Sequence, residues 1–166
     1  MGGWLSFEVV RQLRRQGAPI PVYLFVSGCG APQIPSPHPP LHALPDAEFI
    51  KELRLLNGLP DAVLKFHELM EFILPTLRAD FAVHETYVYS SELPLSVPIC
   101  AFGGLRDSRV SRARLVAWRA QTSVSFKMEM FEGDHFFLHT AQPLLLRRLS
   151  QELNGIGMVH FPPKLS

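Results

Sequence analysis

Two short stretches of nearly continuous apolar residues constrain the fold of this chain more than any other feature. Residues 21–27 and 98–103 combine β-branched and aromatic side chains with little polar interruption. A strand of this kind is buried on both faces, which is typical of a parallel sheet covered by helices. Helical patterns precede, separate and follow the two stretches, so the sequence predicts an α/β fold with a mostly parallel sheet and flanking helices.

The first helix is predicted over residues 4–16. Leu5, Val9 and Leu13 recur at every fourth position, so we expect them to face the core. Arg11 and the two arginines near the end of the segment are expected on the side that faces solvent.

A third strand and two further helices are predicted in the second half of the chain. Residues 124–131 alternate strictly between apolar and polar side chains, which indicates a strand with one polar face near the edge of the sheet. Helical spacing predicts helices over residues 111–121 and 141–153. The second of these is expected to end at Asn154 and Gly155.

Residues 41–81 contain helical patterns and no strand pattern. The patterns cover residues 46–56 and 64–77, with breaks expected at residues 57–60 and at Pro75. This region is therefore predicted to be a block of short helices inserted between strand-bearing segments. A lid over a site and a plain helical layer of the domain fit the periodicity equally well.

Composition and charge exclude several classes of function. The 166 residues carry a net charge of +1 with histidine neutral, which gives no electrostatic basis for a nucleic-acid partner. No apolar run approaches the roughly 18 residues that span a bilayer, so no membrane partner is expected. Cys29 and Cys100 are too few for a disulfide scaffold, which favours a reducing cytoplasm. We expect one cytoplasmic domain over residues 1–166.

Two residues with acid–base chemistry follow predicted strands. Asp107 lies shortly after residues 98–103, and His135 shortly after residues 124–131. One helix separates the two loops, so a right-handed crossover would bring them together at one end of the sheet. A carboxylate beside a histidine is the orienting half of a nucleophilic triad. On spacing alone, a solvated or capping role is the commoner reading for each residue.

A nucleophile for such a triad is not evident in the sequence. The pentapeptide G-x-S-x-G of a nucleophile elbow does not occur. The chain opens with Met1, Gly2 and Gly3 and enters a helix at once, as a chain would directly after such an elbow. Many proteins also begin with methionine followed by glycine.

Other candidate residues have simpler structural interpretations. His135 and His139 have a spacing that metal ligands also use, but no third ligand stands out, so neither a metal nor another cofactor is expected. Cys100 is expected to pack within a strand, and Cys29 is a weak candidate for a reactive thiol. Ser27 lacks the elbow pattern and is interpreted as structural.

Several segments, taken in order, carry a resemblance to one enzyme family. They are residues 1–10, 24–27, 31–32, 39–46, 77–81, 85–87, 98–104, 107, 110, 117–118 and 133–138. These segments resemble the type II thioesterases of polyketide and nonribosomal peptide synthesis, which are α/β-hydrolases whose elbow commonly reads G-H-S-M-G-G. The resemblance implies the C-terminal portion of an α/β-hydrolase fold, with residues 41–81 as an inserted helical lid.

The resemblance also implies an activity and the residues that perform it. Asp107 and His135 correspond to the catalytic acid and base, and the backbone N–H of Met1 corresponds to an oxyanion-hole donor. The nucleophilic serine of the family would precede Met1 and is missing from this chain. The implied reaction is hydrolysis of acyl groups from the pantetheine arm of an acyl or peptidyl carrier protein, without a cofactor.

The sequence also departs from the family at several positions. Cys29 and Gly30 stand where arginines are usual, and Asp134 replaces a common glycine before the histidine. Two other functions are left open at this point. The chain could be an inactive, truncated remnant that still binds a carrier protein, or it could belong to another serine esterase of the same fold.

Overall fold

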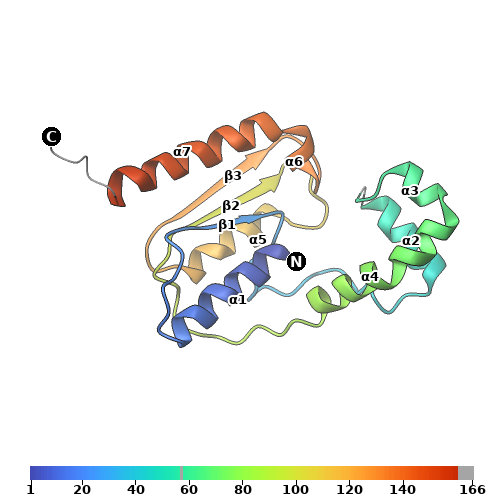
Figure 1. The fold of residues 1–166 in the computed structure, drawn as a ribbon, viewed down its shortest axis with the longest axis horizontal. Helices are drawn as coiled ribbons and strands as arrows, with labels where there is room; N and C mark the ends of the chain where they lie inside the picture. The colour runs from blue at the N-terminus through green and yellow to red at the C-terminus, as the bar shows by residue number, and fades with distance from the viewer. Residues whose placement is uncertain (57, 161–166) are drawn as a thin grey trace.

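A parallel sheet of three strands forms the centre of the computed structural model, which describes residues 1–56 and 58–160 (Figure 1). The strands are β1 (Leu24–Ser27), β2 (Ile99–Gly104) and β3 (Phe126–Phe131), in the order β1-β2-β3. Every residue of β2 is buried, as its continuous apolar sequence predicts. β3 lies at an edge of this sheet, which agrees with its alternating pattern. The predicted α/β fold class is confirmed.

Helices cover both faces of the sheet (Figure 1). Helix α1 (Gly2–Arg15), helix α5 (Arg112–Val116) and the 3-10 helix η1 (Ala117–Gln121) lie on one face. Helices α6 (Phe137–Thr140) and α7 (Gln142–His160) belong to the other face. The sheet is therefore the middle layer of three.

The face of α1 that meets the core differs from the prediction. Trp4, Phe7 and Val10 are buried, whereas Leu5 is 63% exposed and Val9 is 49% exposed. The aromatic side chains at helical spacing set the buried face, because they fill more of the volume between helix and sheet than Leu5 and Val9 would. The prediction that Leu5 and Val9 face the core is thus wrong for the described residues.

Arg11 lies on this buried face and not in solvent, which also corrects the prediction. Its side chain is 2% exposed, and its guanidinium contacts Glu8 Oε1 and Glu92 Oε1, each at 2.6 Å. A buried guanidinium needs such partners because an unpaired charge is costly inside a protein. The contact with Glu92 also ties α1 to the segment that leads into β2.

One apolar core lies between the sheet and α1, and a second lies between the sheet and α7. Its buried residues are Cys100, Phe102, Phe131, Phe137 and Ala141. Cys100 is a packing residue here, as expected. Helix α7 continues past Asn154 and Gly155 to His160, so the predicted end of this helix is wrong. A glycine costs a helix interior only about 1 kcal/mol relative to alanine, which is too little to end the helix by itself.

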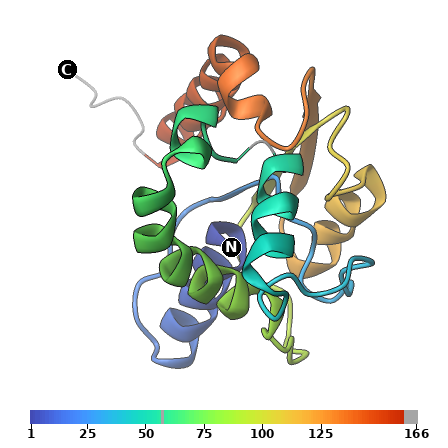
Figure 2. The ribbon, with the colours of Figure 1, turned by 90° about the vertical axis from the view of Figure 1, so that its right-hand side faces the viewer.

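Three helices form a separate block beside the sheet layers (Figures 1 and 2). They are α2 (Asp46–Leu55), α3 (Asp61–Lys65) and α4 (His67–Glu85). The block has a core of its own, made of Leu41, Phe49, Leu53, Met70 and Leu74. Residues 41–56 and 58–85 together form this helical block.

The break expected at Pro75 is absent, because α4 runs through it to Glu85. Proline removes one backbone hydrogen bond and costs a helix interior about 3 kcal/mol. Burial of Met70 and Leu74 before the proline, and contacts of Leu77 and Phe81 with the block's core after it, hold the two halves together. No helix in the described part of the chain combines the length and the apolar composition that a membrane span requires.

Candidate active site

Two loops at the carboxyl ends of β2 and β3 are joined by backbone hydrogen bonds. Leu105 N donates to Phe131 O at 2.8 Å, and Arg106 N donates to Gly133 O at 2.9 Å. The loops also approach closely at Gly104, where a Cβ atom would lie 2.1 Å from the carbonyl oxygen of Asp134. Only a glycine fits this position, so the sequence of β2 fixes how near the two loops lie.

These loops bring Asp107 and His135 into contact, as the order of strands and helices predicts. His135 Nδ1 lies 2.9 Å from Asp107 Oδ2. The other oxygen, Asp107 Oδ1, accepts from the backbone N–H groups of Arg109 at 2.8 Å and Val110 at 3.0 Å. The Asp107 side chain is fully buried, whereas the His135 side chain is 33% exposed. The pair therefore presents its imidazole, and not its carboxylate, to solvent.

The electrostatics of the pair keep the carboxyl group ionised. Burial acts to raise the pKa of Asp107, but its hydrogen bond with His135, the charge of His135 and the two backbone N–H donors together lower the pKa below its ordinary value. An ionised carboxylate only accepts hydrogen bonds, so Nδ1 of the neutral imidazole carries the proton. Nε2 is then the nitrogen that can accept a proton from another group.

Gly28, directly after β1, lies against the imidazole of His135. Its φ angle is 55°, and a Cβ atom there would lie 3.4 Å from Cε1 of His135. The glycine lets the chain turn sharply while remaining close to the ring. A glycine after a predicted strand is a recognisable turn signal, but the sequence did not reveal that this one lies against His135.

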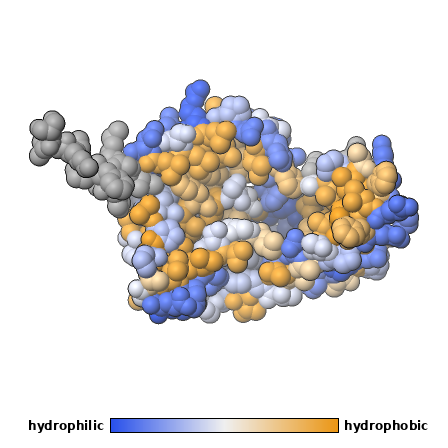
Figure 3. Space-filling model, in the orientation of Figure 1, coloured by the Kyte–Doolittle hydropathy of each residue, from blue (hydrophilic) through white to orange (hydrophobic). Residues whose placement is uncertain are grey.

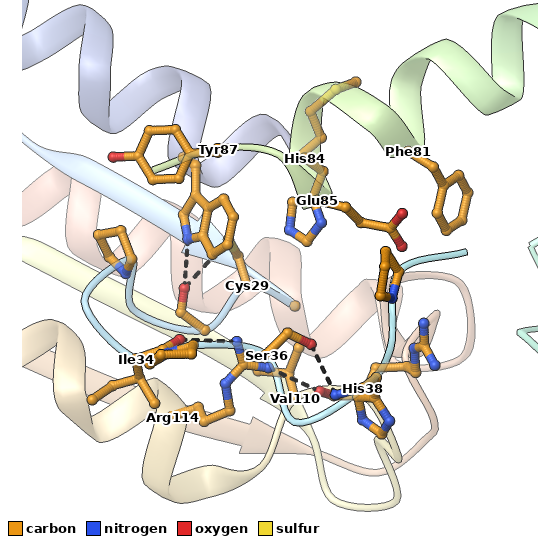
Figure 4. A pocket seen from close by; sticks show the side chains of 18 of the residues that line it. Cys29, Ile34, Ser36, His38, Phe81, His84, Glu85, Tyr87, Val110 and Arg114 are labelled. Atoms are coloured by element: carbon orange, nitrogen blue, oxygen red, sulfur yellow. Dashed lines mark hydrogen bonds between the residues drawn. The ribbon is translucent and has the colours of Figure 1, made fainter. Parts of the chain in front are cut away.

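His135 is one of the residues that line a cavity of about 680 Å³. The walls of this cavity come from several segments of the chain (Figure 4). The segments are the start of α1, the loop that follows β1, the end of α4, and the loops that carry Asp107 and His135. In the space-filling view the surface is hollowed between the sheet layers and the helical block (Figure 3). Leu56 and Phe81 of the helical block form an apolar part of the cavity wall. The cavity is large enough for a small organic ligand.

Met1 lies on the wall of the same cavity as His135. It is the N-cap of α1, and its carbonyl oxygen accepts from Trp4 N at 3.0 Å. Gly3 allows the helix to begin close to the sheet, because a Cβ atom there would lie 3.0 Å from Cys29 Sγ. The positive end of α1 thus points toward the cavity, which favours negative charge there.

His84 is a cavity residue that sequence reasoning missed. It lies near the end of α4, and its ring stacks on the indole of Trp4 with 4.3 Å between ring centroids. Burial, followed by the Met1 ammonium, lowers the pKa of His84 to about 4. Figure 4 shows it beside Glu85 and Phe81. No spacing pattern distinguishes His84 from the other polar residues of α4.

The remaining candidates do not supply a nucleophile. Cys29 is 4% exposed, and burial raises the pKa of its thiol, which disfavours the reactive thiolate. Ser27 lies at the end of β1 without an elbow, and His139 is exposed beside Phe136. Among the described residues, no group of three histidine, cysteine or acidic side chains could hold a metal ion.

The fold and the site together define a class. In α/β-hydrolases, an acid and a histidine follow successive strands of a parallel sheet and meet at its carboxyl end. Residues 1–153 match the thioesterase domain family, and the chain belongs to this family. It is 46% identical to the gramicidin S biosynthesis protein GrsT of Aneurinibacillus migulanus over 153 residues, which are 92% of this chain and 60% of that protein.

Solved structures agree with the family assignment. The thioesterase RedJ from the prodiginine pathway of Streptomyces coelicolor superposes with a TM-score of 0.85 at 37% identity, covering 91% of this chain and 60% of that one. YbtT, a type II thioesterase from the yersiniabactin NRPS/PKS pathway, gives a TM-score of 0.79 at 32% identity, covering 99% and 64%. The chain spans about 60% of the length of the curated relatives GrsT and LgrE.

Proposed function

We propose that this chain forms the acid–histidine half of a type II thioesterase that hydrolyses acyl groups from the pantetheine arm of carrier proteins. The observation that carries the proposal is the 2.9 Å contact between His135 Nδ1 and Asp107 Oδ2 at the edge of the cavity. Membership of the thioesterase family supplies the reaction class. The partner is an acyl or peptidyl carrier protein of a polyketide or nonribosomal peptide synthase, in the cytoplasm.

In this reaction His135 Nε2 takes the proton of a serine hydroxyl as the serine attacks the thioester carbonyl. Asp107 holds the imidazole in the correct tautomer and stabilises the imidazolium that forms. His135 then gives the proton to the leaving pantetheine thiol, and water releases the acyl group from the serine by the same sequence of steps. The acyl chain leaves as a free acid, which clears a stalled synthase.

The serine is not among the candidates in these 166 residues, and we assign it to a position directly before Met1 in a longer polypeptide. Two observations support this assignment. Met1 and His135 line the same cavity, and the curated relatives extend well beyond the matched region. In such a polypeptide the backbone N–H of Met1 is an amide that stabilises the oxyanion, an interaction worth about 2.7–4 kcal/mol in serine hydrolases.

Residues 41–81 act as a lid in this proposal. The apolar side chains of Leu56 and Phe81 line the cavity from the lid side, where an acyl chain would lie. The core of the helical block is separate from the two cores of the sheet layers, which suits an element that moves as a unit.

The first test is the intact mass of the native protein together with its N-terminal peptide. The proposal expects a mass above 18.7 kDa and a serine directly before Met1. That polypeptide should hydrolyse acyl-pantetheine thioesters faster than simple oxygen esters of the same acyl group. A native mass of 18.7 kDa beginning at Met1 would contradict the hydrolytic proposal, and a preference for oxygen esters would favour another serine esterase.

A further inference from the structure

Arg114 presents a guanidinium to the cavity (Figure 4). Its Nη1 donates to the carbonyl oxygen of Arg109 at 3.2 Å, and its Nη2 donates to that of Ile34 at 3.3 Å. Its Nε is buried and makes no hydrogen bond. Within residues 1–56 and 58–160, no carboxylate forms an ion pair with this side chain, whereas Arg11, Arg78 and Arg148 all have one.

Gly30 makes room for this guanidinium. A Cβ atom at position 30 would lie 3.0 Å from both Cζ and Nε of Arg114. Any side chain at position 30 therefore competes with the guanidinium for the same space. The two weak carbonyl contacts and the glycine together hold the charge between the loop that follows β1 and the loop that carries Asp107.

The acids that line the cavity, Asp80 and Glu85, form no ion pair with Arg114 in the described part of the chain. Burial lowers the pKa of Arg114 from its ordinary value, and Asp107, the carboxylate whose charge acts against this, is already committed to His135 and two backbone N–H groups. Glu85 lies on the opposite wall (Figure 4). Both of its oxygens accept hydrogen bonds from the backbone of Leu41 and His42. A partly desolvated guanidinium of this kind gains most from an anion that accepts charge-assisted hydrogen bonds.

We propose that Arg114 binds a small oxyanion carried by the substrate in this cavity, and this rests on the proposed function because the substrate is taken to be an acyl-pantetheine thioester. Two groups of such a substrate have this chemistry. One is a carboxylate on the acyl group, and the other is the phosphate of the phosphopantetheine arm. Arginine suits both, because its planar guanidinium matches carboxylate and phosphate geometry.

The test measures binding by isothermal titration calorimetry, so it does not depend on hydrolysis. The probes are stable amide analogues of acyl-pantetheine in three forms: acetyl, malonyl, and acetyl with a 4′-phosphate. Malonate and inorganic phosphate are titrated alone as well. Each probe is measured with the unchanged chain, with Arg114→Gln, and with Gly30→Ala, which keeps the charge but displaces the guanidinium. Arg112→Gln is the matched control, because Arg112 is exposed on the same helix and does not line the cavity.

We expect Arg114→Gln to weaken one anionic probe by about 10-fold to 100-fold relative to the acetyl probe, as loss of a charged hydrogen-bond donor does. Gly30→Ala should weaken the same probe, and Arg112→Gln should not. A loss confined to the malonyl probe assigns the anion to the acyl group, and a loss confined to the phosphorylated probe assigns it to the arm.

Two outcomes separate this inference from the proposed function. Suppose that Arg114→Gln lowers the affinity for malonate or phosphate while no pantetheine probe binds to any variant. That result would support the anion site at Arg114 and contradict the proposal that acyl-pantetheine is the substrate. If the ratio of anionic to neutral affinity is the same in Arg114→Gln and in the unchanged chain, the inference is overturned. The Met1 ammonium also lines the cavity, but it is present in every variant, so its contribution to this ratio cancels when the variants are compared.

Discussion

The carboxylate of Glu85, the last residue of α4, accepts a hydrogen bond from the backbone N–H of Leu41, which lies 44 positions earlier in the chain. Leu41 N is 2.9 Å from each oxygen of Glu85. The same carboxylate accepts from His42 N at 2.9 Å and contacts His42 Nδ1 at 2.7 Å. Burial acts to raise the pKa of Glu85, but these contacts lower it. One side chain thus joins the two ends of the helical block.

The first prediction follows from this junction. Glu85→Ala leaves the N–H groups of Leu41 and His42 without their acceptor, so the free energy of unfolding should fall by about 1–3 kcal/mol. Amide hydrogen exchange at Leu41 and His42 should accelerate more than exchange in β2. The matched control is Glu71→Ala on the same helix, whose exposed pair with His67 should contribute less than about 0.5 kcal/mol. Equal effects of the two substitutions would show that Glu85 does not join the block's ends.

Stability should also fall in acid. The pKa of Glu92 is lowered to about 2 by hydrogen bonds with Arg15, Arg11 and Arg14, and the pKa of Asp107 is lowered as well. A carboxyl whose pKa is lower in the folded state binds protons more weakly there than in the unfolded chain. Its stabilising contribution is therefore complete above the unfolded pKa of about 4.3 for Glu and is lost as the pH falls toward about 2.

Urea unfolding between pH 2 and pH 7 measures this dependence. The slope of unfolding free energy against pH below pH 4.5 should be smaller for Glu92→Gln than for the unchanged chain. Glu48→Gln should change the slope much less, because Glu48 is exposed in the first turn of α2 and has no ion pair within the described part of the chain. Identical slopes for all three proteins would mean that Glu92 does not contribute through its charge.

The strands and the acid–histidine pair could be predicted from the sequence, because both depend on local patterns and on the handedness of a crossover. Residues 98–103 needed only their continuous apolar composition. The positions of Asp107 and His135 after strands predicted that they lie close together, but their interpretation as an acid–base pair also needed the resemblance to the thioesterase family. The buried face of α1 could not be predicted in the same way. Its periodicity allows a core face through Leu5 or through Trp4, and the choice depends on the volume between helix and sheet.

The cavity residues were harder to predict for a related reason. Arg114 lies on a short helix and meets Gly30, which is 84 residues away in sequence, so only the tertiary structure shows that one makes room for the other. Pro75 and Gly155 are local helix breakers that packing and neighbouring helical residues override. In each of these cases a long-range contact or the sum of many weak ones outweighs the local signal.

The catalytic roles proposed for Asp107 and His135 lead to a third prediction, which concerns the proposed longer polypeptide with a serine directly before Met1. Asp107→Asn should lower kcat for an acyl-pantetheine thioester by about 10⁴-fold, because an amide no longer fixes the tautomer of His135. His135→Ala should lower kcat by about 10⁶-fold, the loss found when a base of this kind is removed. His139→Ala is the control and should change kcat by less than about threefold, since His139 is exposed. Comparable losses in all three variants would contradict the assignment.

The close approach at Gly104 allows the most direct test of how the site is held together. In Gly104→Ala the new Cβ would meet the backbone carbonyls of Asp134 at 2.1 Å and Gly133 at 2.8 Å, so the two loops must separate. We expect the free energy of unfolding in urea to fall by about 1–3 kcal/mol, the usual cost of overpacking. The NMR signal of the His135 Nδ1 proton should also broaden or shift, because separating the loops lengthens its contact with Asp107.

Gly155→Ala is the control for this substitution. A Cβ at position 155 meets nothing within 4 Å, and the residue lies inside α7, so alanine should raise the unfolding free energy by about 0.5–1 kcal/mol. The opposite signs of the two glycine substitutions separate close loop packing from backbone flexibility. If Gly104→Ala were as stable as the unchanged chain and kept the His135 signal, the contact between the loops would not be what positions Asp107 against His135.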